Sequence, residues 1–197
     1  MDVFEAIKER RSIRSYLEKP VPKEVVERIV EAGTYAPSGA NLQPWEFVLV
    51  DDPELKKEIA RGAKFLFIKS RHVDEAPALL VCLADTQKSK WSLIDVSLAC
   101  QNIMLAAHAL GLGTCFIGIF DEKRIKELLQ IPDKYKIVGL ITLGYSSRKE
   151  EAPPRVPVSD VLTFNSFYGQ EKKKPIKRHF KSGPLSIWKK VIKMLFR

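Results

Sequence analysis

The chain has 197 residues, of which 45% are hydrophobic, enough to bury the core of one sizeable domain. Its formal net charge is +9, but residues 170–197 hold ten of the Lys and Arg residues and one Glu, which leaves residues 1–169 neutral. The body therefore has no electrostatic reason to bind nucleic acid, and polar residues interrupt its longest apolar region, which argues against a membrane span.

The predicted elements alternate between helices and strands along the chain. Apolar residues at helical spacing predict helices, with Pro22, Gly33 and Asp121 as boundary signals. We expect these helices at about residues 23–33, 53–68, 91–109 and 122–130. Short apolar runs predict strands at residues 46–50, 78–84, 114–119 and 135–143. The alternation implies a layered sheet with helices on both faces.

The predicted helix at 91–109 is apolar nearly all round, so we expect it in the core. His108, near its end, is interpreted as a core or interface histidine. Cys82, Cys100 and Cys115 lie in apolar runs, which indicates reduced thiols in a cytoplasmic protein. The first residues form a polar amphipathic segment, so no signal peptide is expected.

Two polar stretches interrupt this framework. Arg10, Arg11, Ser12 and Arg14 lie within five residues, and guanidinium groups at this density suit phosphate or carboxylate oxygens. A solvated basic turn after a helix is the plain alternative. Residues 36–45 form the second stretch, which is rich in turn formers and small polar side chains.

These stretches, together with three later ones, resemble the FMN-dependent nitroreductase family. The motifs are RRSIR at residues 10–14, APSGANLQPWEF at 36–47, EAP at 75–77, LGLGTC at 110–115, and LGY at 143–145 with the segment to residue 155. Each motif alone is weak, but their order and spacing match from residue 2 to about 169. The resemblance implies an α+β fold with a central, mostly antiparallel sheet flanked by helices. It also implies a domain-entwined homodimer with an FMN in each of two sites at the subunit interface.

The resemblance assigns roles to the basic stretch. Arg10 and Ser12 match positions that hold the ribityl phosphate, and Arg11 matches a position that also contacts the flavin. Arg14 matches a basic residue at the pyrimidine end of the ring system. A fixed cation there stabilises the negative charge that two-electron reduction brings to the ring.

Further positions are assigned in the same way. Pro37, Ser38 and Asn41 match residues that reach the flavin from the other subunit, with a plain turn as the alternative. Ile117 and Gly118 match the end of a strand where a backbone N–H faces the hydride-accepting nitrogen of the ring. Several family members have Glu-Gly at residues 118 and 119, where this chain has Gly-Ile, and we expect this difference to widen the pocket or to change which molecules bind.

Three positions match less directly. Arg155 matches a second phosphate-binding arginine, although well-known members often have a lysine two residues earlier, where this chain has Pro153. Arg11 is a candidate to offset that loss. Lys69 and His72 fall near positions that contact the flavin edge in other members, with a loose alignment.

The implied activity is that of an NAD(P)H-dependent oxidoreductase whose flavin carries the chemistry. NADH or NADPH delivers hydride and leaves, and a nitroaromatic, quinone or related oxidant then takes two electrons at the same face. No side chain is needed as a nucleophile, and the His and Cys residues show no metal-ligand spacing. Two alternatives stay open: a member of divergent chemistry, either dehalogenation or flavin fragmentation, and a flavin-binding or membrane-docking module.

The basic C-terminal residues are predicted to form a separate extension. We expect an FMN-binding domain at residues 1–169 and an extension at 170–197 that ends in a basic amphipathic helix. The favoured partner of this helix is the body or the other subunit, an anionic membrane surface is the second candidate, and nucleic acid is not expected. Cytoplasmic localisation follows, with peripheral membrane attachment as the alternative.

Overall fold

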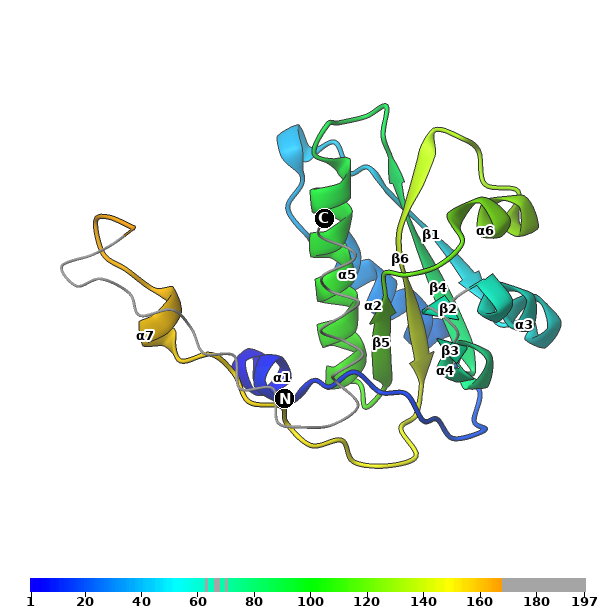
Figure 1. Cartoon of the computed structure of the whole chain (residues 1–197), viewed down its shortest axis with the longest axis horizontal. Helices are drawn as coiled ribbons and strands as arrows, with labels where there is room; N and C mark the ends of the chain where they lie inside the picture. Colours follow the sequence, from blue (N-terminus) through cyan, green and yellow to red (C-terminus); the bar gives the residue numbers. More distant parts are fainter. Residues whose placement is uncertain (63, 66–67, 70, 168–197) are drawn as a thin grey trace. The chain divides into compact units, whose positions relative to one another are not determined.

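A four-stranded sheet forms the centre of the structure (Figure 1). Its strands are β1 (Trp45–Val50), β4 (Ala78–Asp85), β5 (Gly113–Ile117) and β6 (Tyr135–Gly144). They lie in the order β1-β4-β6-β5, and each neighbouring pair is antiparallel. The predicted α+β class with an antiparallel central sheet is confirmed.

The computed structural model describes residues 1–62, 64–65, 68–69 and 71–167. The chain divides into two compact units, residues 1–152 and 153–197, and the described part of the second unit contains the short helix α7 (Val158–Val161). The predicted basic extension at 170–197 and its boundary at residue 169 lie outside the described residues and stay predictions.

Helices accompany the sheet in the first unit. They are α1 (Val3–Glu9), α2 (Lys23–Thr34), α3 (Pro53–Gly62), α4 (Arg71–Glu75), α5 (Ser92–Ala109) and α6 (Glu122–Leu129). A single turn of 3-10 helix, η1 (Gly39–Asn41), precedes β1. A small hairpin of β2 (Lys64–Phe65) and β3 (Ile68–Lys69) lies between α3 and α4.

Both faces of the sheet are covered, as predicted. One face packs with α2 and α5, and the other packs with α3 and α6. Side chains of β4 alternate between the two clusters, with Leu80 and Cys82 in the first and Leu79 and Val81 in the second. This period of two explains why a central strand covered on both faces is a continuous apolar run.

The three cysteines are buried thiols, as predicted. A hydrogen bond with Cys100 and burial raise the pKa of the Cys82 thiol well above its ordinary value. Burial also raises the pKa of Cys115, against the charge of Arg14 and a hydrogen bond with Ser12. Thiols with raised pKa values carry little thiolate at neutral pH and are therefore poor nucleophiles.

Two predicted boundaries are wrong. The helix predicted at 53–68 ends at Gly62, because the Gly62 carbonyl accepts a hydrogen bond from the Asp121 N–H at 3.0 Å and its Cα lies against the start of α6. The hairpin β2–β3 and helix α4 follow instead. The strand predicted at 114–119 ends at Ile117, and residues 118 and 119 lead into α6.

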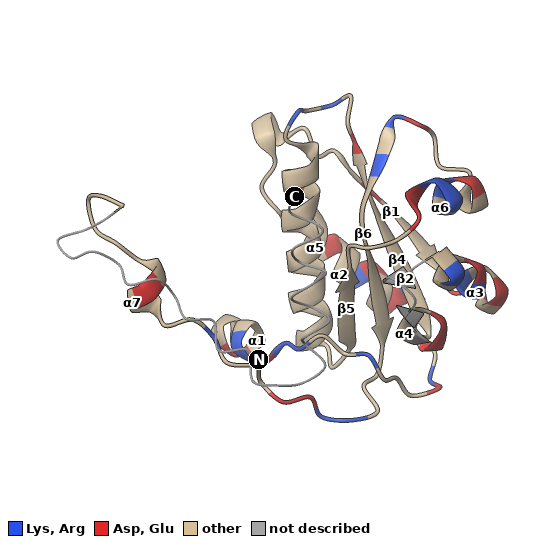
Figure 2. Cartoon of the chain, viewed as in Figure 1, with Lys and Arg blue, Asp and Glu red and all other residues tan. Residues whose placement is uncertain are grey.

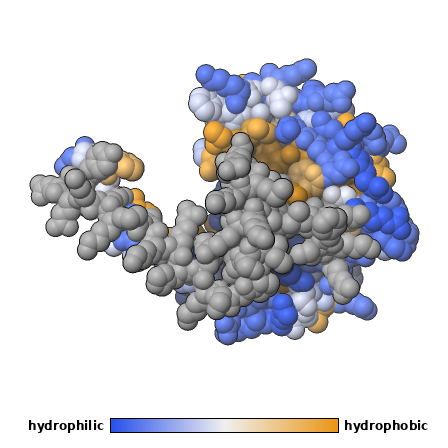
Figure 3. All heavy atoms as spheres, viewed as in Figure 1, coloured by the Kyte–Doolittle hydropathy of each residue, from blue (hydrophilic) through white to orange (hydrophobic). Residues whose placement is uncertain are grey.

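Helix α5 is only partly a core helix, contrary to the prediction. Val96, Ala99 and Ile103 are fully buried, whereas Ile94 and Leu98 are 54% and 42% exposed. Among Asp, Glu, Lys and Arg, α5 contains Asp95 alone, and Figure 2 shows that charged residues gather on α3 and α6 instead. The exposed Leu93, Ile94 and Leu98 accordingly give α5 an apolar surface, and Figure 3 shows apolar surface in the upper part of this view. Within the described ranges, no helix has the length and apolar character to cross a bilayer.

Candidate functional site

The basic stretch after α1 runs beside β5 at the edge of the sheet. Arg10 caps α1 with its backbone N–H bonded to the Ala6 carbonyl at 3.0 Å. Ser12 forms a parallel bridge with Thr114, and the Ile13 N–H donates to the Thr114 carbonyl at 2.8 Å. Extended backbone places alternate side chains on opposite sides, so Ile13 is buried while Arg14 is exposed.

A glycine is required where this stretch meets the sheet. A Cβ at Gly113 would lie 2.7 to 2.9 Å from three carbon atoms of Ile13, including its Cβ, which cannot rotate away. We expect Gly113→Ala to displace residues 12–14 from β5 and to lower the free energy of unfolding by about 1–3 kcal/mol. Gly118→Ala is the matched control, because its Cβ would meet only a Phe116 carbon at 3.8 Å. Equal urea midpoints for the two variants would contradict this packing.

Tyr16 fixes the far end of the stretch. Its hydroxyl donates to the Ile13 carbonyl at 2.7 Å and lies 2.6 Å from Thr142 Oγ1 on β6. Burial raises the pKa of the Tyr16 phenol above its ordinary value, so the group stays a neutral donor. The basic stretch is thus held at both ends by the sheet, and the Arg11 guanidinium donates to the Lys8 and Arg10 carbonyls at 2.6 and 2.7 Å.

Unpaired polar atoms concentrate at this place. Among the described residues, four buried side-chain N or O atoms have no hydrogen-bond partner, and three of them are Arg11 Nε, His108 Nε2 and Thr114 Oγ1. Arg11 belongs to the basic stretch, Thr114 pairs with it, and the charges of Arg10 and Arg11 act on His108. Buried polar groups without partners are uncommon and commonly mark where a ligand or water binds. The surroundings, rich in cationic donors, favour an anion.

The second polar stretch lies at the opposite end of α5. The Gly39 N–H donates to Asp95 Oδ2 at 3.3 Å in the first turn of α5, and the Gln43 N–H donates to Ser38 Oγ at 3.1 Å. Ala40, Asn41 and Gln43 have φ angles of 49°, 55° and 46°. Left-handed backbone at three non-glycine residues is costly and indicates a loop whose shape is imposed by its role. Pro37 and Asn41 are exposed there.

Ile117 and Gly118 lie at the end of β5. Ile117 pairs with Leu140 of β6 and is buried, whereas Gly118 is exposed. β5 is the last strand of the sheet, and apart from the bridge at Ser12 no described strand pairs with its outer side. Backbone groups near Ile117 therefore face outward along the same edge as the basic stretch.

The structure places the three positions that match the family less directly in different parts of the chain. Arg155 is exposed in the second unit, in the irregular segment before α7. Lys69 belongs to β3. His72, in α4, is half-buried, and burial together with the charge of Arg14 lowers its pKa. His72 therefore lies in the electrostatic reach of the basic stretch, which the sequence leaves open.

The two polar stretches do not meet within one chain. The loop at residues 36–45 is hydrogen-bonded to Asp95 in the first turn of α5. The basic stretch lies beside His108 in the last turn of the same helix. A helix rises 1.5 Å per residue, so these ends are about 20 Å apart. Figure 1 shows η1 at one end of α5 and α1 at the other.

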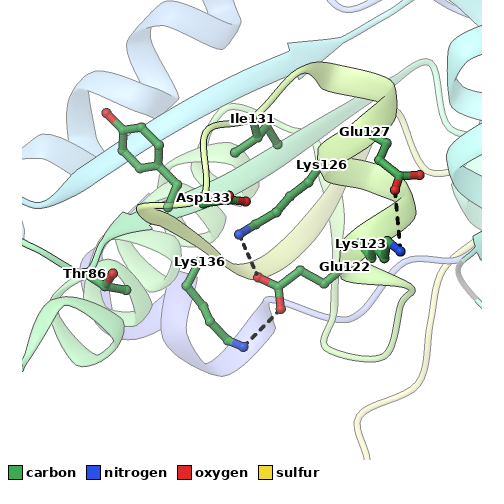
Figure 4. Close-up of a pocket in the computed structure, with 9 residues that line it drawn as sticks. Thr86, Glu122, Lys123, Lys126, Glu127, Ile131, Asp133 and Lys136 are labelled. Atoms are coloured by element: carbon green, nitrogen blue, oxygen red, sulfur yellow. Dashed lines mark ion pairs between the residues drawn. The ribbon is translucent and has the colours of Figure 1, made fainter.

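A surface cavity of about 660 Å³ lies elsewhere, between α6 and the start of β6 (Figure 4). Glu122 is central to it, with Lys136 at 3.0 Å and Lys126 at 3.8 Å. Burial would raise the pKa of Glu122, but the Ile137 N–H and these two lysines lower it. The three lysines that line the cavity pair with Glu122 or Glu127, and none of the predicted site residues lies there. The basic stretch and the strand edge are therefore the better candidate site.

Sequence reasoning missed two contributors. Thr114 is part of an apolar strand, and Asp95 is one polar residue in an apolar helix. A lone carboxylate in the first turn of an apolar helix was a usable signal for Asp95, since a carboxylate needs a partner when it is buried. Nothing in the sequence distinguishes the unpaired hydroxyl of Thr114 from a paired one.

Comparison with known proteins identifies the family to which this fold and these motifs belong. Residues 7–145 match the sequence pattern of the Nitroreductase family. A Methanothermobacter thermautotrophicus protein with the provisional name NADH dehydrogenase/NAD(P)H nitroreductase is 37% identical over 153 residues, which cover 74% of this chain and 78% of that protein. The Bacillus subtilis FMN reductase (NADPH) is 27% identical, over 84% of this chain and 74% of the relative.

A solved structure agrees with these relatives. The FMN-dependent nitroreductase from Clostridium difficile R20291 is 34% identical and superposes with a TM-score of 0.72, over 83% of this chain and 99% of that one. The match of the family pattern spans the basic stretch, the loop at residues 36–45 and every strand of the central sheet. The chain belongs to the nitroreductase family.

Proposed function

We propose that this protein is an FMN-dependent NAD(P)H oxidoreductase that passes two electrons to nitroaromatic, quinone or related oxidants. Membership of the family and relatives named as an FMN reductase and an FMN-dependent nitroreductase support this function. The donor set supports it independently, because a phosphate needs several fixed N–H and O–H groups and the unpaired atoms of Arg11 and Thr114 lie in a cationic setting.

The proposed roles follow from the placement of each side chain. Arg10 and Ser12 hold the phosphate, Arg11 adds charge beside it, and Arg14 faces the pyrimidine end of the ring system. Bound FMN supplies the hydride and electron chemistry. The chain orients the cofactor, places positive charge where negative charge develops, and excludes water.

Further residues complete the proposed site. Arg155 supplies a second guanidinium for the phosphate, and the outward-facing backbone at Ile117 and Gly118 borders the reacting side of the ring. Pro37, Ser38 and Asn41 enclose the flavin from the partner chain. These assignments rest on the family motifs, with the rigid edge of β5 as structural support.

A homodimer is part of the proposal, and one observation carries it. The basic stretch and the loop at residues 37–41 lie at opposite ends of α5, about 20 Å apart. A twofold axis that packs α5 of one chain antiparallel to α5 of the other would bring the loop of each chain beside the basic stretch of its partner. The exposed Leu93, Ile94 and Leu98 supply an apolar surface for that contact.

We also propose a cytoplasmic location. The three cysteines are all buried thiols without disulfide bonds, which suits a reducing compartment. Fractionation of cells that express the full-length chain tests this, and recovery with the membranes would favour the alternative peripheral attachment.

The experiment that tests the function is anaerobic titration of the purified protein. We expect yellow protein that retains FMN, is bleached by NADH or NADPH, and regains its colour with a nitroaromatic or quinone. Steady-state turnover with a panel of both oxidant classes would then define the substrate. Protein that fails to bind added FMN would contradict the proposal.

Arg14 offers a second test, on the potential of the bound cofactor. We expect Arg14→Ala to lower the midpoint potential, because a fixed cation no longer stabilises the reduced ring. A loss of about 1–3 kcal/mol corresponds to roughly 20–60 mV for a two-electron couple. Arg28→Ala, which removes an exposed arginine from α2, is the control. An unchanged potential in an Arg14→Ala protein that retains FMN would show that the assignment is wrong.

A further inference from the structure

His108 lies in the last turn of α5 and has no role in the function described so far. Its Nε2 atom is buried and lacks a hydrogen-bond partner, as does Arg11 Nε. α1 packs against α5, and Glu9, the last residue of α1, acts on the imidazole together with Arg10 and Arg11. An imidazole with one unpaired buried nitrogen thus borders the residues proposed to hold the phosphate.

The charges around His108 keep it neutral while the phosphate site is empty. Burial lowers its pKa, Glu9 raises it, and Arg10 and Arg11 lower it again. The last carbonyl groups of α5 add partial negative charge that favours the protonated form. Glu9 at the end of α1 and the two arginines in the segment after it are the ionised groups that face the ring. The balance favours the neutral form at neutral pH.

We propose that His108 is a further residue of the phosphate site and that its protonated fraction rises, by uptake of a proton from solvent, when the FMN phosphate binds beside Arg10 and Arg11. The inference rests on the proposed function. A phosphate group brings a charge of about −1.5 to −2 at pH 7, which offsets the positive charges of Arg10 and Arg11. The negative charge of Glu9 then favours the protonated form of the imidazole. The proton then stabilises the phosphate, and dissociation of FMN returns it to solvent.

The sign of the pH dependence follows from this linkage. Because the bound state holds His108 more readily in the protonated form, FMN binds more tightly as the pH falls from 8 toward 6.5. We expect a gain of about two- to four-fold over this range. Below about pH 6 the phosphate itself takes up a proton, so the comparison belongs above that value.

The test is calorimetric titration of FMN into the full-length apoprotein near pH 7, in two buffers of different ionisation enthalpy. The difference in heat gives the protons bound per FMN. We expect wild type to take up a substantial fraction of one proton and His108→Gln to lose that uptake and the gain in affinity at lower pH. Arg28→Gln is the control, because Arg28 is exposed on α2 and belongs to neither polar stretch, and it should keep wild-type uptake.

A second measurement needs no variant. The ¹H–¹³C NMR signal of the His108 ring should titrate at a higher pH with FMN bound than without it. Equal proton uptake by wild type and His108→Gln, or an unchanged titration of this signal, would overturn the inference and leave the oxidoreductase function intact. Failure of the wild-type apoprotein to bind FMN would instead overturn the proposed function.

Discussion

Charge reversal at Arg10 is expected to weaken FMN binding by about a hundredfold or more. Arg10→Glu removes a charge-assisted contact worth about 1.5–3 kcal/mol and adds repulsion between a carboxylate and the phosphate. Each 1.4 kcal/mol is a factor of about ten in affinity. Fluorescence titration of the apoprotein with FMN gives the dissociation constant directly.

Arg28→Glu makes the same change of charge at an exposed position on α2 and serves as the control. It should bind FMN as wild type does, which separates the local contact from the net charge of the protein. Equal affinities for Arg10→Glu and Arg28→Glu would place the phosphate elsewhere.

Two aspartates on the exposed face of α5 are expected to convert the protein to a monomer that does not retain FMN. Ile94 and Leu98 lie one helical turn apart and are 54% and 42% exposed. An Ile94→Asp, Leu98→Asp chain would bury two charges in the proposed interface, which is expensive without partners. Sedimentation velocity gives the mass, and the visible spectrum gives the FMN content.

An Ile94→Leu, Leu98→Ile chain keeps the surface apolar and should remain dimeric with its cofactor. Circular dichroism should show equal helix content in both variants, since the changed positions are exposed in the single chain. A dimer with full FMN content in the aspartate variant would remove α5 from the interface.

Most of the fold follows from the sequence because its strongest signals are local. The continuous apolar run of β4 and the cap at Asp121 predict a central strand and the start of α6, and both are found. The end of α3 is different, because a hydrogen bond from Asp121 to the Gly62 carbonyl decides it. Contacts between residues so far apart in the chain leave no periodic signal.

The candidate site is predictable to a smaller extent. The density of arginines marks the basic stretch, but composition alone cannot distinguish it from a solvated turn. The structure adds the pairing of Ser12 with Thr114 and the unpaired nitrogens of Arg11 and His108. The separation of the two polar stretches also depends on which end of α5 each one contacts, and only the tertiary structure sets that.

The central claim is that each site is shared between two chains, and subunit mixing tests it most directly. One chain carries Arg10→Glu and Arg14→Glu, and the other carries Ser38→Trp. The large side chain at residue 38 should block the share of the site that the loop contributes, and the extended backbone of Ser38 accepts it without strain. Each homodimer has two damaged sites and should retain little FMN. After subunit exchange at equal concentrations, half of the dimers are mixed.

A mixed dimer of shared sites has one site with all the damage and one site with none. FMN content and NAD(P)H oxidation should therefore return to about one quarter of the wild-type values, since one site in four is intact. A site built within a single chain would stay damaged in every dimer. Exchange that is verified by mass spectrometry but restores no FMN binding would contradict the account.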